Sequence, residues 1–166
     1  MEVLLAELPD RKTHPTGCPV KEYYTVMWGT SFRKKTMASL RWNDLDLERA
    51  VVRVRASADK RQFGREVPLS PAAVKVLRSL QPGVGLIFGR RDFRTSLKNA
   101  AKRAGITKHL TPNHSIRHSR LTDMASRSKN IAAIQHMAGH KDLASTMKYV
   151  HGSVDAARSM LEEVDG

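Results

Sequence analysis

The chain has 166 residues, of which 40% are hydrophobic, and this suits one domain with a packed core. Its single cysteine, Cys18, excludes a disulfide scaffold and is typical of a reducing compartment. No run of 18 apolar residues occurs and the first residues lack the basic region of a signal peptide, so neither a membrane span nor a secretory leader is expected. The 29 Lys and Arg outnumber the 16 Asp and Glu, and the formal charge of +13 indicates a polyanionic partner, most often nucleic acid.

The first half of the chain is predicted to combine short helices with a small sheet. Helices are expected over residues 1–8, 20–29 and 33–40. Residues 51–55 alternate β-branched and basic side chains, which predicts a strand. Residues 64–69 resemble a returning strand, which Pro68 restricts to the edge or the end of a sheet. Residues 42–45 would supply the third strand, and residues 59–63 a basic hairpin tip.

The second half is predicted to be helical. Ser70-Pro71 is an N-cap followed by proline at the first helical position, and Thr111-Pro112 opens a helix in the same way. Three further helices are expected to start near residues 92, 131 and 142, and the first two end at Gly105 and Gly139. The fold class is therefore α+β, mostly α-helical with a small three-stranded antiparallel sheet, in one domain over residues 1–166.

Several common site motifs are missing or incomplete. The glycine-rich residues 83–89 form neither a P-loop nor a dinucleotide fingerprint and are better explained as a turn leading into a short apolar strand. Two histidine pairs have i,i+4 spacing, His114 with His118 and His136 with His140. Neither pair has the glutamate that follows the first histidine of a zinc protease, so no metal site is expected.

Basic residues, histidines and a tyrosine instead recur at ordered spacings. Arg33 lies nine residues before Trp42, within Leu-Arg-Trp, and Lys60 lies seven residues before a Val-Pro-Leu segment at 67–69. Further on, residues 114–118 read His-Ser-Ile-Arg-His. A Gly-His pair follows at 139–140, and Tyr149, in Tyr-Val-His, stands nine residues after that histidine.

This ordered set resembles the catalytic domain of the tyrosine recombinase (phage integrase) family over about residues 20–151. The resemblance implies that family's catalytic-domain fold, with no cofactor and no metal. It also implies six catalytic residues, namely Arg33, Lys60, His114, Arg117, His140 and Tyr149. The chain departs from the family pattern where Ser31 replaces a usual glycine and where Thr36 replaces a frequent glutamate that supports the first arginine.

The resemblance implies that Tyr149 cleaves a DNA strand, leaving a 3′-phosphotyrosine and a free 5′-hydroxyl. Arginine binds phosphate oxygens in a bidentate fork and stays protonated, so Arg33 and Arg117 suit the role of phosphate clamp. Tyrosine in water has a pKa of about 10, so roughly one molecule in a thousand is ionised at pH 7. His114 is the candidate for moving that proton and His140 for a hydrogen bond to the phosphate. Lys60, in the predicted hairpin, would protonate the departing 5′-oxygen.

Double-stranded DNA is the expected partner. The residues expected to contact its backbone are Arg61, Arg90, Arg91, Arg94, Lys98, Lys102 and Arg103. We expect an integrase-type site-specific recombinase in the cytoplasm of a bacterium or encoded by a phage, associated with the nucleoid. A type IB topoisomerase-like relaxing enzyme and a catalytically impaired DNA-binding protein are the alternatives.

The resemblance has two implications for assembly. The family's N-terminal core-binding domain is expected to be absent from these 166 residues, which would form the catalytic domain. Recombinases of this family act as tetramers on paired sites and pass C-terminal segments between protomers. An apolar stripe is formed by Val154, Ala157, Leu161 and Val164. We expect it to pack on a neighbouring protomer or on its own domain.

Overall fold

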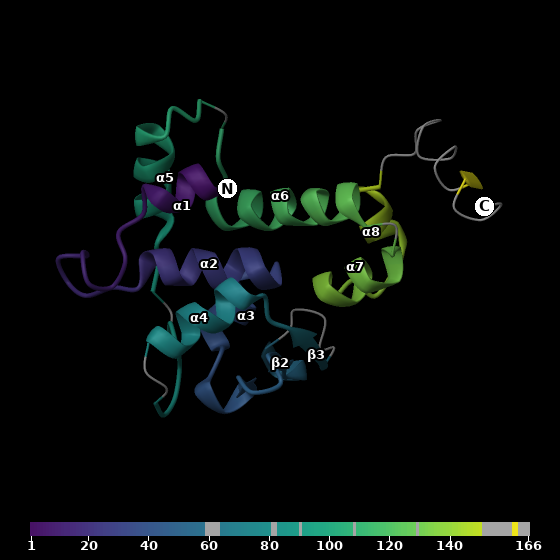
Figure 1. Ribbon diagram of the computed structural model, residues 1–166, viewed down its shortest axis with the longest axis horizontal. Helices are drawn as coiled ribbons and strands as arrows, with labels where there is room; N and C mark the ends of the chain where they lie inside the picture. Colours follow the sequence, from purple (N-terminus) through teal and green to yellow (C-terminus); the bar gives the residue numbers. More distant parts are fainter. Residues whose placement is uncertain are drawn as a thin grey trace.

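The computed structural model contains helices and one small antiparallel sheet, so the α+β prediction is confirmed (Figure 1). It describes residues 1–58, 64–80, 83–89, 91–107, 109–128, 130–150 and 161–162. The predicted hairpin tip at 59–63 lies outside this range, as does most of the C-terminal stripe. No helix in the described part of the chain is long and apolar enough to cross a membrane.

The sheet has the order β1-β2-β3, with antiparallel pairing throughout. Its strands are β1 (Leu45–Asp46), β2 (Val51–Val54) and β3 (Arg65–Pro68). Pro68 is the last residue of an edge strand, as predicted. The expectation of a strand over residues 42–45 is wrong for most of its length, because Trp42–Asp44 forms a 3-10 helix, η1. The Asp44 carboxylate accepts the backbone N–H of Arg41 at 2.9 Å and closes this turn before pairing can begin.

The described residues form nine further helical segments. They are α1 (Glu2–Ala6), α2 (Val20–Thr30), α3 (Lys34–Ser39), η2 (Ala56–Ala58), α4 (Pro71–Ser79), α5 (Arg94–Arg103), α6 (Pro112–Arg127), α7 (Ile131–Ala138) and α8 (Ala144–Met147). Ser70 Oγ accepts the N–H of Ala73, so the predicted cap of α4 is confirmed. Residues 83–89 do not form the expected strand and make only an isolated bridge, between Leu86 and Arg41.

Two hydrophobic clusters hold the described part of the chain together. In the larger one, α2 packs against both α4 and α6, and buries the predicted face of Val20, Tyr24 and Met27. The smaller one joins the second half of α6 to α7 through Leu121, Ile134 and Ala138. Figure 1 shows α6 running from the α2 side of the molecule to α7 and α8. The long helix α6 therefore connects the two clusters.

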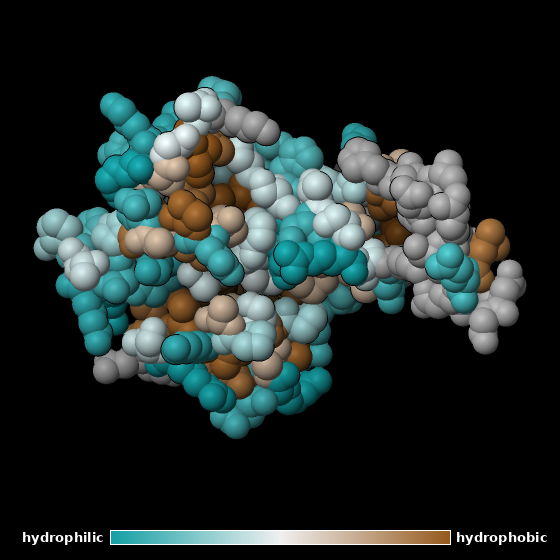
Figure 2. Space-filling view, turned by 45° about the horizontal axis from the view of Figure 1, so that its top comes forward, coloured by the Kyte–Doolittle hydropathy of each residue, from teal (hydrophilic) through white to brown (hydrophobic). Residues whose placement is uncertain are grey.

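One face of the molecule is mainly polar. Figure 2 shows hydrophilic residues over most of the face it presents, with hydrophobic residues in separate small clusters. This distribution agrees with a chain in which charged residues make up 27% of the sequence.

Candidate active site

A cleft of about 950 Å³ lies between the starts of α3, α5 and α6 and the segment around α8. Five of the six residues expected to be catalytic line it, and they are Arg33, His114, Arg117, His140 and Tyr149. These residues are up to 116 positions apart in the sequence and come from separate elements, so the fold is what brings them together. The sixth, Lys60, lies outside the described residues.

Arg117 is the buried centre of the site. It lies on α6, and its guanidinium donates to two backbone carbonyls, Ser31 O and Ala138 O, the latter at 2.8 Å. It also donates to Nε2 of His140 at 3.1 Å. Its side chain is held from three directions, by the end of α2, the end of α7 and the turn that follows α7. A guanidinium fixed in this way is preorganised to face an anion that enters the cleft.

The hydrogen bonds of His140 define its tautomer. A guanidinium can only donate, so Nε2 of His140 accepts from Arg117, and the ring proton of the neutral form sits on Nδ1. That Nδ1–H donates to Oγ1 of the buried Thr146, 2.9 Å away. The backbone of His140 is tied to Gln135, whose side-chain amide donates to His140 O at 3.1 Å. Sequence spacing did not single out Thr146 or Gln135, because neither belongs to the pattern that carried the resemblance.

The turn between α2 and α3 explains one departure from the family pattern. Ser31 ends α2 with φ of +53°, in the left-handed region that favours glycine. Its carbonyl accepts a hydrogen bond from Arg117, and Arg33, the N-cap residue of α3, lines the cleft two residues later. Phe32, between them, is buried in the larger cluster and anchors the turn. A glycine, which the family resemblance leads one to expect at this position, would adopt this conformation without strain, and this chain has a serine there instead.

Tyr149 lies two residues after α8 and is half-buried beside the histidines. Its ring is nearly parallel to that of His140, with centroids 6.2 Å apart, and meets the ring of His118 edge-on at 5.0 Å. The other two tyrosines, Tyr23 and Tyr24, are buried in the core, where burial raises the pKa of both phenols. Of the three tyrosines, Tyr149 alone lines the cleft.

The two histidines of α6 differ in their surroundings. His114 is exposed in the first turn of the helix and lines the cleft. Its ring meets that of His118 at a centroid distance of 6.0 Å, and His118 in turn contacts Tyr149. His118 was expected only as part of the His-Ser-Ile-Arg-His segment, and its contact with Tyr149 comes from the fold.

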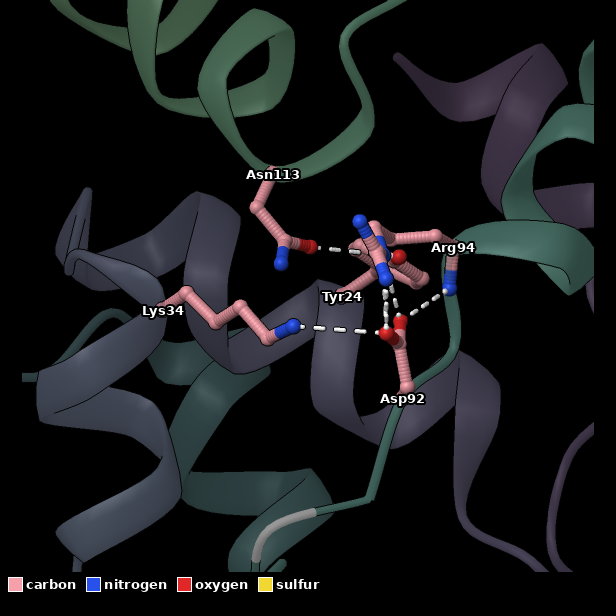
Figure 3. A network of polar contacts seen from close by, with 5 residues as sticks. All are labelled: Tyr24, Lys34, Asp92, Arg94 and Asn113. Carbon is pink, nitrogen blue, oxygen red and sulfur yellow. Dashed lines mark hydrogen bonds and ion pairs between the residues drawn. The ribbon is translucent and has the colours of Figure 1, made fainter.

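A polar network lies at the α5 side of the cleft (Figure 3). The Asp92 carboxylate pairs with Nζ of Lys34 at 3.3 Å and with Nη2 of Arg94 at 2.6 Å. Hydrogen bonds from Arg94, and then the charge and hydrogen bond of Lys34, hold the pKa of Asp92 well below its usual range. Close by, Tyr24 donates its hydroxyl proton to Oδ1 of Asn113 at 3.3 Å, which ties α2 to the first turn of α6.

The residues expected to contact DNA fall into separate groups. Arg94 and Lys98 line the cleft. Arg91, three residues before Arg94 in the sequence, is exposed. Lys102 lines a neighbouring hollow of about 510 Å³. Arg103 is exposed but bound to Glu7 of the segment after α1, with Nε 3.1 Å from Oε2. Arg61 and Arg90 lie outside the described residues.

No group of three or more histidine, cysteine or acidic side chains that could hold a metal ion occurs in the part of the chain that the structure describes. The residues that line the cleft supply cations, hydrogen-bond donors and a phenol. Together these form a site suited to a phosphodiester.

The sequences of known proteins place this α+β domain in a family. A model of the phage integrase family matches residues 1–155, and the chain belongs to that family. It is 30% identical to the tyrosine recombinase XerC of Xanthomonas campestris pv. campestris, over 90% of this chain and 48% of that protein. It is 28% identical to the tyrosine recombinase XerD of Listeria monocytogenes serotype 4b, over 82% of this chain and 51% of that protein. The chain spans about half the length of these curated relatives.

Solved structures agree on the fold. The XerA recombinase matches with a TM-score of 0.73 and 24% identity, over 99% of this chain and 61% of that one. The catalytic domain of bacteriophage HP1 integrase matches with a TM-score of 0.73 and 22% identity, over 97% of this chain and 89% of that one. The expected tyrosine recombinase catalytic-domain fold is confirmed.

Proposed function

We propose that this chain carries out the strand cleavage and rejoining of a site-specific DNA recombinase. The observation that carries the proposal is the meeting of two arginines, two histidines and a tyrosine in one cleft. The phenol oxygen of Tyr149 attacks a backbone phosphorus, a P–O bond forms to the tyrosine, and the bond from phosphorus to the 5′-oxygen breaks. The 5′-oxygen leaves with a proton. Attack by a 5′-hydroxyl reverses these steps and releases the tyrosine.

Arg33 and Arg117 would bind the non-bridging oxygens, where negative charge grows in the transition state. Deprotonating a tyrosine at pH 7 costs about 4 kcal/mol if nothing assists it. His114, in the same cleft, is the proposed proton acceptor. His140 would bind the phosphate through Nε2, which requires the doubly protonated ring, because the neutral tautomer in this structure carries its proton on Nδ1. Lys60 is the proposed proton donor to the 5′-oxygen.

The partners and setting are part of the proposal. Double-stranded DNA suits the formal charge of +13, and the XerC and XerD relatives carry the name of recombinases, which favours recombination over topoisomerase-like relaxation. Among structures of the same fold, the Tn1549 transposon integrase is in complex with a circular intermediate DNA. We propose assembly as a tetramer on paired sites and association with the nucleoid. We also propose that these residues form a catalytic domain that acts with a separate core-binding domain.

The test is covalent capture on DNA. A library of nicked duplexes with a randomised central segment serves as substrate, so that the test presupposes no target sequence. Adducts are separated on denaturing gels. The nick lets the short fragment that bears the free 5′-hydroxyl diffuse away, so that the phosphotyrosine is trapped. The wild-type chain should form an adduct that survives denaturation and is destroyed by protease.

Tyr149→Phe removes one oxygen and almost no volume, so DNA binding should persist while the adduct disappears. Tyr23→Phe makes the same change in the core and should leave adduct formation intact. An adduct formed equally well by Tyr149→Phe would rule out this tyrosine as the nucleophile. Absence of any adduct, with DNA still bound, would favour the catalytically impaired alternative.

A further inference from the structure

A third arginine, Arg65, lies next to the site without lining the cleft. It is the first residue of β3, and only 8% of its surface is exposed. Its Nη2 donates to the carbonyl of Met137, in the last turn of α7, at 3.5 Å. A Cβ added to Gly139 would overlap its guanidinium at Cζ and at both terminal nitrogens. The guanidinium therefore packs directly on the backbone of Gly139.

This contact falls where α7 ends and the turn to His140 begins. Gly139 has φ of +62° and terminates the helix. Arg65 binds Met137 O and Arg117 binds Ala138 O, so two arginines bind consecutive carbonyls at this helix end. Cations are favoured there, because the last carbonyls of a helix carry partial negative charge.

A second contact joins the same two elements. Nε2 of His136 on α7 donates to the carbonyl of Glu66 on β3 at 2.6 Å. Adjacent residues of β3 thus contact the last turn of α7. In the sequence, β3 begins five residues after Lys60, so the strand that contacts the last turn of α7 also lies close in sequence to the proposed proton donor.

We propose that Arg65 is a positioning residue, which holds the Gly139-His140 turn against the sheet so that His140 and Arg117 keep their mutual geometry. The proposal deepens the proposed function and rests on it for its effect on catalysis. The proposal also predicts the tautomer and position of the His140 ring, and these can be measured without DNA cleavage. Lysine cannot replace Arg65, because an ammonium has neither the flat face that covers Gly139 nor the fork of donors.

The first measurement is the ring nitrogen spectrum of ¹⁵N-histidine-labelled protein, with His140→Gln used to assign the signal. In the wild type, His140 should show the tautomer with its proton on Nδ1. Arg65→Lys and Arg65→Gln should both shift or broaden that signal. Arg53→Lys is the matched control, because Arg53 lies on the neighbouring strand with its side chain 73% exposed and should leave the signal unchanged. An unaltered His140 signal in folded Arg65→Lys would overturn the proposal whether or not the chain cleaves DNA.

The second measurement is the rate of adduct formation at saturating protein. Misplacing a catalytic group by about 1 Å can cost as much as 10²-fold, so Arg65→Lys should slow the reaction by about 10–100-fold with DNA affinity unchanged. The defect should persist on a substrate with a 5′-thiolate leaving group, which needs no proton, because the affected groups bind the phosphate. Rescue by the thiolate would place the effect at Lys60 and contradict the proposal. Unfolding of both Arg65 variants at 25 °C would assign the residue to stability alone and also contradict it.

Discussion

Replacing Ser31 with glycine should stabilise the protein, although Ser31 touches the candidate active site. Ser31 has φ of +53°, and a left-handed conformation costs a residue with a side chain about 1–2 kcal/mol. Its buried Oγ has no hydrogen-bond partner among the described residues, and a hydroxyl in that position costs about 1 kcal/mol or more. Against these gains, glycine adds about 0.5–1 kcal/mol of chain entropy to the unfolded state. The net expectation for Ser31→Gly is a gain of about 1–2 kcal/mol.

Chemical and thermal unfolding measure this gain. For a domain of this length, 1 kcal/mol shifts Tm by about 2–4 °C, so an increase of about 2–8 °C is expected. Two controls separate the contributions. Ser31→Ala removes the hydroxyl but keeps the strained backbone, and Ala50→Gly relieves a similar φ of +52° without involving a hydroxyl. Each should give a smaller gain than Ser31→Gly.

The bond from Arg117 to Ser31 O should survive the substitution, because the acceptor is a backbone atom. Adduct formation by Ser31→Gly should therefore stay within about twofold of the wild type, as expected when no polar contact is lost. A variant no more stable than the wild type would show that the surroundings of Ser31 already compensate for its strain. That result would refute the reasoning from φ and burial.

Four further outcomes are expected. Gly139→Ala should lower the free energy of unfolding by about 2 kcal/mol or more in denaturant titrations, because it adds left-handed strain and a Cβ that overlaps Arg65. Thr146→Val should cost about 1–3 kcal/mol and slow adduct formation, because Nδ1 of His140 loses its buried acceptor; equal rates would contradict the assigned tautomer. Lys60→Ala should slow cleavage of ordinary DNA but not of a 5′-thiolate substrate, measured side by side on gels. DNA affinity should fall by about 10³–10⁵ between 50 and 200 mM salt if 6–10 phosphates are bound, and a flat response in a binding titration would argue against backbone contact.

Local sequence signals predicted most helices and two of the three strands. The starts at Ser70-Pro71 and Thr111-Pro112 depend on proline and capping chemistry within a few residues, and the structure has helices there. The predicted strand at residues 42–45 failed because an aspartate side chain competes with strand pairing by bonding to the backbone three residues earlier. Such competition depends on a rotamer that apolar patterning does not reveal.

The candidate site could likewise be predicted only in part from the sequence. Ordered spacing identified Arg33, Arg117, His140 and Tyr149, because their residue types and intervals form a pattern. Two of the partners that hold Arg117 are backbone carbonyls, one of them 86 residues away, and every residue has such a carbonyl. Arg65 was likewise not predicted, since only the packing of β3 against α7 distinguishes it from the other arginines.

The division of the core into two hydrophobic clusters has a mechanical consequence. Arg33 follows Phe32, which is buried in the larger cluster. Tyr149 packs instead on the smaller cluster, whose described buried residues are Leu121, Ile134 and Ala138. Segments with few buried contacts open more readily than a main core. A local opening of the smaller cluster would withdraw the phenol while Arg33 and the main core stay folded. We therefore expect the availability of Tyr149, the proposed nucleophile, to be set by the free energy of this local opening, separately from that of global unfolding.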